Sequence, residues 1–402
     1  MAALDIKTVF EYAAAFLSLY SIVLLAVVLL QHKGRLGGNP RPPKRLPKLT
    51  VIIPAYNEEK TIAKTIESVL ASKYPKDSLQ VIVVNDGSTD GTRRIAESFR
   101  KRGVLVLSKE NGGKGAALNY AIRRATGEFI ATLDSDSYIE KDSLAKMFGH
   151  FNRPDVAAVI SVMKVWRQET FWQKFQGVEY VVMVFIRQLQ SFLDSVSVTP
   201  GPLSIFRARI FAEIGGFDEH NILEDQEMAL RIQKHNYRIK CSTNAVVYTD
   251  APRTFRELLQ QRIRWYRGGV RNFFSHYYLM SPKYGDFGIF AMPFAILSIL
   301  LVIFMLALVA YLLVTGVTLA AFQVYANYGL DAVVYGVNGL QLIMLALLAI
   351  VGLFSYASLK YFQSEYINAP MLLFYILFYS PIVLIFWAAS FLQEIRLAKM
   401  KW

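Results

Sequence analysis

The chain has 402 residues, of which 54% are hydrophobic and only 19% are charged. This composition excludes a disordered chain and is too apolar for one soluble globule, so we expect part of the chain to lie in a membrane. Basic residues exceed acidic residues by 13, which suits anionic lipid head groups or a phosphate-bearing substrate. The single cysteine, Cys241, excludes an intramolecular disulfide and a cysteine-based zinc site.

The N-terminal part, residues 1–48, predicts one transmembrane helix and a basic linker. Residues 12–31 are uncharged, and a helix needs about 20 such residues to cross about 30 Å of hydrocarbon. A cleaved signal peptide is the alternative, but its apolar core is shorter and no A-x-A-like site follows this run. The basic residues of the linker, among them Lys33 and Arg35, place the next segment in the cytoplasm by the positive-inside rule.

Residues 287–402 predict the other membrane region. Uncharged runs cover residues 287–330, 332–359 and 366–393. The first run fits either one helix with an external loop or two short helices, so three or four C-terminal spans are compatible with it. We expect three spans, and hence a multi-pass protein of the plasma membrane.

Residues 49–252 have a different pattern, in which short apolar runs alternate with helical stretches. LTVIIPAY, LQVIVVND, GVLVLSK and GEFIATLDSD have the length and composition of buried strands. This alternation predicts an α/β fold with a mainly parallel sheet and helices on both faces. Ligands of such sheets bind beyond the carboxyl ends of the strands. Here those ends have Glu58, Asp86 and Asp134, which should therefore converge on one site.

Asp134 and Asp136 form a D-x-D triplet directly after a predicted strand. Two carboxylates at this spacing can hold a hard divalent cation, Mg²⁺ or Mn²⁺, that keeps open positions for a diphosphate. The same triplet also forms ordinary turns and helix caps. Its chemistry therefore depends on the motifs around it.

Three more motifs lie near the predicted strand ends. Asn57 can cap the next helix while Glu58 faces the cavity. Asp86 can accept hydrogen bonds from the base or ribose of a nucleotide, and Lys114 lies in a glycine-rich loop that suits phosphates. Each motif alone fits equally well a capped helix, a turn or a common loop.

Taken together, seven motifs occur in a characteristic order: PAYNEE, VNDGSTDGT, NGGKGAALN, DSDS, GGFDE, LEDQEM and QRIRW. The series resembles the family-2 inverting glycosyltransferases of the GT-A fold, in particular the membrane-embedded branch that includes cellulose, chitin and hyaluronan synthases. The resemblance covers about residues 49–268. It implies a UDP-sugar donor, a Mg²⁺ or Mn²⁺ cofactor, and transfer to a growing glycan that could leave through the membrane helices.

The resemblance also implies roles for individual residues. Donor contacts would come from Ala55, Tyr56, Glu58, Asp86, Lys114, Asp134, Gln261 and Arg264, and the cation would bind Asp134 and Asp136. An inverting transfer is a single displacement and needs one base, which the motif assigns to Asp225, next to Glu224. The family usually has Thr-Glu-Asp or Gly-Asp-Asp here, so Leu223 removes a hydroxyl. The acids also simply favour a helix N-terminus.

Acceptor contacts are implied for Trp265, whose flat indole can support a sugar, and for the turn at Gly201 and Pro202. Gln261, Arg264 and Trp265 share one face of a helix within residues 253–286, which we expect to lie at the membrane interface. The alternatives are that this helix is only an amphipathic helix at the membrane surface, and that the turn at Gly201 and Pro202 is only a connector. The aromatic stretch 166–193 predicts another interfacial helix, with packing and anchoring roles rather than ligand contacts.

Two other functions stay open on sequence grounds. A distributive enzyme would add one sugar to a polyprenyl phosphate or another lipid, with the helices holding that lipid. A transporter or channel that senses nucleotide-sugars is disfavoured because the predicted spans have hardly any ionisable residues. Nucleic acid is not expected as a partner, because the basic residues lie next to predicted membrane surfaces and no nucleic-acid motif is present.

Overall fold

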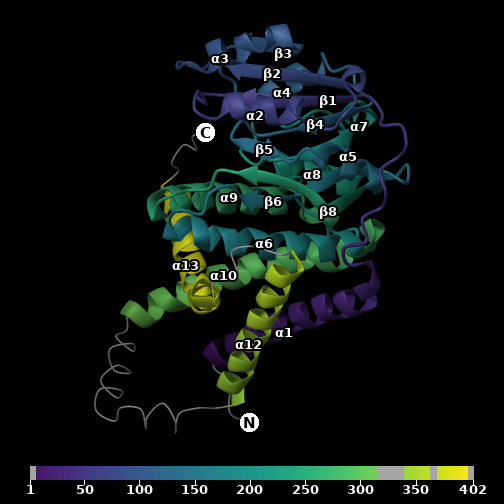
Figure 1. Ribbon diagram of the computed structural model, residues 1–402. Helices are drawn as coiled ribbons and strands as arrows, with labels where there is room; N and C mark the ends of the chain where they lie inside the picture. Colours follow the sequence, from purple (N-terminus) through teal and green to yellow (C-terminus); the bar gives the residue numbers. More distant parts are fainter. Residues whose placement is uncertain (1–5, 315–338, 363–368, 397–402) are drawn as a thin grey trace.

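The computed structural model describes residues 6–314, 339–362 and 369–396. A large sheet with its covering helices forms one end of the molecule, and apolar helices form the other (Figure 1). Two long helices, α6 and α9, lie between these two parts. The apolar helices and the α/β part are therefore connected through this middle layer.

The sheet has eight strands. In spatial order they are β3 (Val104–Lys109), β2 (Leu79–Asp86), β1 (Leu49–Ala55), β4 (Phe129–Thr132), β7 (Ser204–Arg207), β6 (Val156–Val165), β8 (Arg238–Thr249) and β5 (Ser137–Ile139). Strands β3, β2, β1 and β4 are parallel, and β7 is antiparallel to both of its neighbours. The predicted mainly parallel sheet is confirmed. The chain order reverses between β1 and β4, which makes their carboxyl ends the switch point where ligands bind.

Side chains alternate between the two faces of the sheet, as strand geometry requires. Val51 and Ile53 of β1 belong to one buried cluster, and Ile52 belongs to the other. The first cluster includes α2 (Ile62–Leu70), α3 (Thr92–Ser98) and α5 (Ser143–Met147); the second includes α4 (Lys114–Ile122), α7 (Ala208–Ile214) and α8 (Glu224–Lys234). Helices on both faces are thus confirmed, and burial on both sides explains the continuous apolar strands.

The middle layer consists of α6 (Phe171–Phe192) and α9 (Phe255–Ser275). Each helix begins with a capping box, in which Thr170 pairs with Gln173 and Thr254 with Glu257. The predicted helices at these positions are present. Phe175, Phe185 and Leu189 of α6 pack in a buried cluster with side chains of the apolar helices.

The apolar helices are α1 (Ile6–Gln31), α10 (Met292–Val314), α12 (Gly339–Tyr361) and α13 (Ala369–Ile395). Within the described part of the chain, the segments Phe287–Tyr311 and Ala369–Ile395 are long and apolar enough to cross a membrane. Helix α1 includes the predicted run 12–31 and begins before it. The count of three C-terminal spans stays a prediction, because residues 315–338 and 363–368 lie outside the described residues.

Candidate active site

A cavity of about 790 Å³ opens at the carboxyl ends of β1, β2 and β4 and continues to α10 and α13. It is lined by every residue for which the sequence predicts a site role: Ala55, Tyr56, Glu58, Asp86, Lys114, Asp134, Asp136, Gly201, Pro202, Glu224, Asp225, Gln261, Arg264 and Trp265. Residues from six of the seven motifs, and from the turn at Gly201 and Pro202, are thus brought together. Their individual roles stay predictions.

Lys114 is the central cation of the sheet end of this cavity. It begins α4, and its Nζ lies 2.6 Å from Asp134 Oδ1 and 3.1 Å from Glu224 Oε1. Gly201 lies directly against this group, since a Cβ there would be 2.3 Å from Lys114 Nζ and 2.5 Å from Asp134 Oδ2. The missing side chain therefore makes room for the ion pair, and the predicted acceptor contact of Gly201 stays a prediction.

Asp86 orders the loop that precedes α4. Its buried carboxylate accepts hydrogen bonds from the backbone N–H groups of Gly112 at 3.1 Å and Gly113 at 2.8 Å. Lys109 Nζ lies 2.8 Å from the same carboxylate. Much of its acceptor capacity is thus used within the protein, and the remaining lone pairs face the cavity that Asp86 lines.

The two carboxylates of the D-x-D triplet have two more, Glu58 and Asp250, close to them. Burial, Asp134 and Glu58 together raise the pKa of Asp136 to about 7, although Ser137 Oγ donates a hydrogen bond to it at 3.0 Å. Burial is also the main cause that raises the pKa values of Glu58 and Asp250. Such repulsion between buried oxygen donors is what a hard divalent cation relieves, so the donor set fits Mg²⁺ or Mn²⁺.

A bound divalent cation would need oxygen ligands from the substrate as well as from the protein. Among the described residues, no three acidic, histidine or cysteine side chains converge closely enough to hold a metal ion by themselves. Two carboxylates and the oxygens of a diphosphate would complete such a shell. Asp134 and Asp136 are the residues that would hold the cation.

Asn57 does not cap α2, contrary to the prediction. It has a left-handed backbone conformation with φ of 57°, and the N-cap of α2 is Thr61. Its side-chain oxygen instead accepts a hydrogen bond from Thr89 N at 2.9 Å, and its own N–H donates to Ser88 Oγ at 3.0 Å. Asn57 therefore ties together the loops that follow β1 and β2.

Asp225 lies in the first turn of α8, where the helix dipole favours a negative charge. The backbone carbonyl oxygen of Asp225 accepts hydrogen bonds from Thr199 N at 3.2 Å and Thr199 Oγ1 at 2.7 Å. Burial raises the pKa of its carboxyl group, while Lys114 opposes and Asp134 adds to that effect. Leu223 has no hydroxyl, and the Thr199 hydroxyl contacts the backbone of Asp225 rather than its carboxylate.

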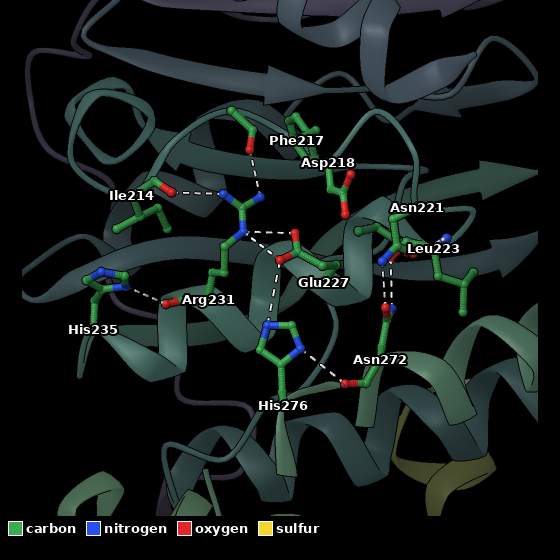
Figure 2. A network of polar contacts seen from close by, with 12 residues as sticks. Ile214, Phe217, Asp218, Asn221, Leu223, Glu227, Arg231, His235, Asn272 and His276 are labelled. Carbon is green, nitrogen blue, oxygen red and sulfur yellow. Dashed lines mark hydrogen bonds and ion pairs between the residues drawn. The ribbon is translucent and has the colours of Figure 1, made fainter. Parts of the chain in front are cut away.

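A polar network fixes α8 against α9 and the GGFDE loop (Figure 2). Arg231 Nε donates to Glu227 Oε2 at 2.8 Å, and its other nitrogens donate to the carbonyls of Ile214 and Gly216. Asn272 of α9 donates to Leu223 O at 3.2 Å and accepts from Asn221 Nδ2 at 2.6 Å. The helix that presents Asp225 is therefore held at both ends.

Helix α9 presents Gln261, Arg264 and Trp265 to the cavity. The helix is anchored beside this face by Arg262, which pairs with Glu179 of α6 at 2.5 Å in a fully buried site. The Arg262 guanidinium lies 4.1 Å from the centre of the Trp265 ring, which limits how that ring can turn. Gln261 Oε1 is buried and has no hydrogen-bond partner among the described residues.

Several cavity residues were not predicted from the sequence. Helix α6 contributes Tyr180, Met183 and Arg187, although its stretch was assigned only packing and anchoring roles. Asp250, at the end of β8, joins the carboxylate group. One available signal was that Glu179 and Arg187 are the only charges between residues 175 and 193.

Comparisons with known proteins agree with this geometry. Residues 50–215 match the family model described as "Glycosyl transferase family 2". The chain is 30% identical over 271 residues to a poly-beta-1,6-N-acetyl-D-glucosamine synthase of Staphylococcus aureus (strain COL), covering 65% of each chain. It is also 30% identical over 235 residues to the synthase of that name from Staphylococcus epidermidis, covering 56% of this chain and 57% of the relative. The match thus spans about two thirds or less of the length of these relatives.

One solved structure is similar over a larger share of both chains. The mannosyltransferase PcManGT of Pyrobaculum calidifontis, in complex with GDP-Man and Mn²⁺, is 26% identical with a TM-score of 0.55. The alignment covers 79% of this chain and 94% of that chain. The predicted fold class therefore agrees with a known glycosyltransferase structure.

Proposed function

Because the chain belongs to glycosyl transferase family 2, we propose that it is a membrane glycosyltransferase that moves sugar units from a UDP-sugar to a growing polysaccharide. The observation that supports this most is the single cavity shared by Lys114, the D-x-D carboxylates, Asp225 and Trp265. A phosphate site, a base and a sugar platform are thus available to one bound pair of substrates. The cavity also reaches α10 and α13, which is compatible with a product that leaves through the membrane.

The sheet end of the cavity would bind the donor. Lys114 can compensate charge on the diphosphate, and Asp86 keeps the loop of Lys114 in position. Asp134 and Asp136 would hold Mg²⁺ or Mn²⁺, which supplies charge neutralisation for the leaving diphosphate. The presence of Mn²⁺ in the complex of the similar mannosyltransferase supports this cofactor.

Asp225 would act as the base. The acceptor hydroxyl oxygen forms a bond to the anomeric carbon while the bond to the diphosphate breaks, so the configuration inverts. The electron pair leaves with the nucleotide, and the hydroxyl proton passes to the Asp225 carboxylate. Glu224 is paired with Lys114 and would keep that lysine near the diphosphate.

Trp265 would support the terminal sugar of the acceptor, because an indole face packs well on the apolar face of a sugar ring. Its position between Arg262 and the cavity limits its rotation. Gln261 Oε1 is buried without a partner among the described residues and could accept a hydrogen bond from a substrate hydroxyl. These features support a defined acceptor site.

A lipid acceptor is the second candidate. The membrane end of the cavity is lined by Val270, Phe273, Ala295, Ile299 and Trp387. Such an apolar lining suits a hydrocarbon chain better than a hydrated glycan. The enzyme would then add one sugar to a polyprenyl phosphate or another lipid.

The catalytic part would lie at the cytoplasmic face of the plasma membrane. The basic linker after α1 supports this orientation. Single cysteines would be introduced at solvent-exposed positions of the α/β part, in a Cys241→Ser background. They should react with a membrane-impermeant thiol reagent only after the cells are opened. Labelling of intact cells would contradict the orientation.

Product sizing tests the proposal. Detergent-purified protein would be incubated with Mn²⁺ and labelled UDP-sugars or GDP-mannose, with EDTA and the Asp225→Asn variant as controls. We expect a long polymer from one UDP-sugar and none with EDTA. One sugar on an added lipid would favour the second candidate, and no transfer from any donor would contradict both.

A further inference from the structure

Arg187 is a cation of the cavity lining to which neither the sequence motifs nor the proposed mechanism assigns a role. It lies on α6, where Tyr180, Met183 and Arg187 follow each other at helical spacing and all line the cavity. This face of α6 lines the same cavity as Trp265, the proposed acceptor platform. A guanidinium is therefore available within the cavity in which the acceptor would bind.

The guanidinium of Arg187 lacks a fixed anionic partner. Its Nη1 is buried, with no hydrogen-bond partner, and Arg187 forms no ion pair within the described ranges 6–314, 339–362 and 369–396. Burial lowers its pKa, and nearby groups, among them Asp225, oppose this effect only in part. Burying a charge without a partner costs free energy, so a ligand that supplies an anion would be stabilised here.

The same helix shows how the protein usually treats such a charge. Two turns earlier, Glu179 is buried and paired with Arg262 at 2.5 Å, and Tyr379 donates a second hydrogen bond to it. At the strand ends, Lys114 is paired with two carboxylates. Arg187 differs from both, because it lines the cavity and forms no ion pair with any described residue.

Two observations together indicate the chemical class of ligand that would fit here. Asp225, the proposed base, lines the same cavity as Arg187 and interacts with it electrostatically, so the anion would lie in the cavity in which the acceptor reacts. The same cavity then continues into an apolar region at Val270, Phe273 and Ile299, beside the membrane helices. A molecule with an anionic head and a hydrocarbon tail matches both ends.

From this arrangement we infer that Arg187 binds the phosphate of a lipid phosphate, and that such a lipid is the acceptor on which the enzyme places its first sugar. The inference rests on the proposed function and names its starting acceptor. In polymer synthesis the lipid phosphate would begin the chain, and in a distributive reaction it would be the sole acceptor. Arg187 would bind and orient it, since a planar guanidinium can donate two parallel hydrogen bonds to a phosphate.

Variants of α6 test the inference in the full chain. Farnesyl phosphate and farnesol are matched probes, because they share the tail and differ in the phosphate. Wild type should transfer labelled sugar to farnesyl phosphate and at least about 10-fold less to farnesol. Arg187→Gln should raise the half-saturating farnesyl phosphate concentration about 10-fold or more, and Arg187→Lys should recover part of the loss.

Three readouts separate acceptor binding from a general defect. Lys174→Gln changes an exposed cation of the same helix and should behave as wild type. UDP binding and the slow hydrolysis of the donor by water should be unchanged in Arg187→Gln. If this variant does not fold, the Arg187→Lys titration and the wild-type preference between the two probes still decide the question.

Particular results would overturn the inference. Equal use of farnesol and farnesyl phosphate by wild type would do so, as would an unchanged half-saturating concentration in Arg187→Gln. Transfer to a glycan but not to any lipid phosphate would remove the lipid and leave the proposed function intact. Absence of transfer to every acceptor would instead contradict the proposed function.

Discussion

The two ends of the cavity are built differently. At the strand ends, charged residues are paired: Lys114 with Asp134 and Glu224, and Asp86 with the glycine loop. Near α10 and α13 the lining is apolar, and Arg187 lines the cavity without an ion-pair partner among the described residues. Under the proposed function, the protein would order the donor site in advance, whereas the acceptor would complete part of its own site.

Asp225 lies between these two ends, so its removal should have the largest effect. Asp225→Asn keeps the size of the side chain but cannot accept the proton, and we expect transfer to fall about 10²- to 10⁴-fold. UDP binding, measured by calorimetry on the same protein, should remain nearly unchanged. Retained turnover would remove Asp225 as the base.

The next effect concerns the cation at the strand ends. Asp136→Ala should lower transfer about 100-fold, because neutralisation of the leaving diphosphate contributes several kcal/mol. Titration of Mn²⁺ in the presence of UDP should show weaker metal-dependent binding than in wild type. An unaltered Mn²⁺ dependence would count against a ligand role for Asp136.

A single methyl group can disturb the donor end alone. Gly201→Ala would put a Cβ 2.3 Å from Lys114 Nζ, so the Lys114 and Asp134 side chains must shift. Overpacking of this kind costs about 1–3 kcal/mol, and we expect the KM for the donor to rise about 10- to 100-fold. The matched change Gly269→Ala, where the nearest atom is 3.7 Å away, should have little effect on that KM.

The corresponding change at the acceptor side is Trp265→Ala. Loss of the aromatic platform should raise the acceptor concentration needed for half-maximal rate about 10-fold while the donor KM stays constant. Trp265→Phe should recover part of the loss. A change confined to the donor KM would show that Trp265 belongs to the other end.

The smallest expected effect is a displaced pH profile. The pKa of Asp225 is raised above the ordinary 3.8, chiefly by burial. The base acts only when ionised, so kcat should fall as the pH drops through this raised pKa, above the range of an ordinary aspartate. The residual rate of Asp225→Asn should lack this acidic limb, and a flat wild-type profile down to pH 3.8 would contradict the assignment.

Sequence patterns predicted the donor end well for a physical reason. Parallel strands end at one edge of a sheet, so Glu58, Asp86 and Asp134 had to come close once the strands were recognised. The mainly parallel sheet and its covering helices follow from the same alternation. Gln261, Arg264 and Trp265 share a face through helical spacing alone.

The rest depends on tertiary packing that local patterns do not contain. Arg187 reaches the cavity only because α6 crosses beneath the sheet, and Asp250 only because β8 ends beside the D-x-D turn. Asn57 was predicted to cap a helix, yet its left-handed backbone directs it to Thr89 of a neighbouring loop. Contacts between distant segments decided each of these cases.

The contact between α8 and α9 gives the enzyme a mechanical property. Gly268 of α9 is so close to Leu223, just before Asp225, that a Cβ would lie 2.7 Å from the leucine side chain. The same helix is joined to α13 by Arg267 Nε, 2.6 Å from Glu394 Oε2. If α13 tilts to match a thicker or thinner bilayer, α9 should move with it and shift the position of Asp225, the proposed base. Turnover in vesicles of different acyl-chain length would measure this coupling, and equal rates in all of them would exclude it.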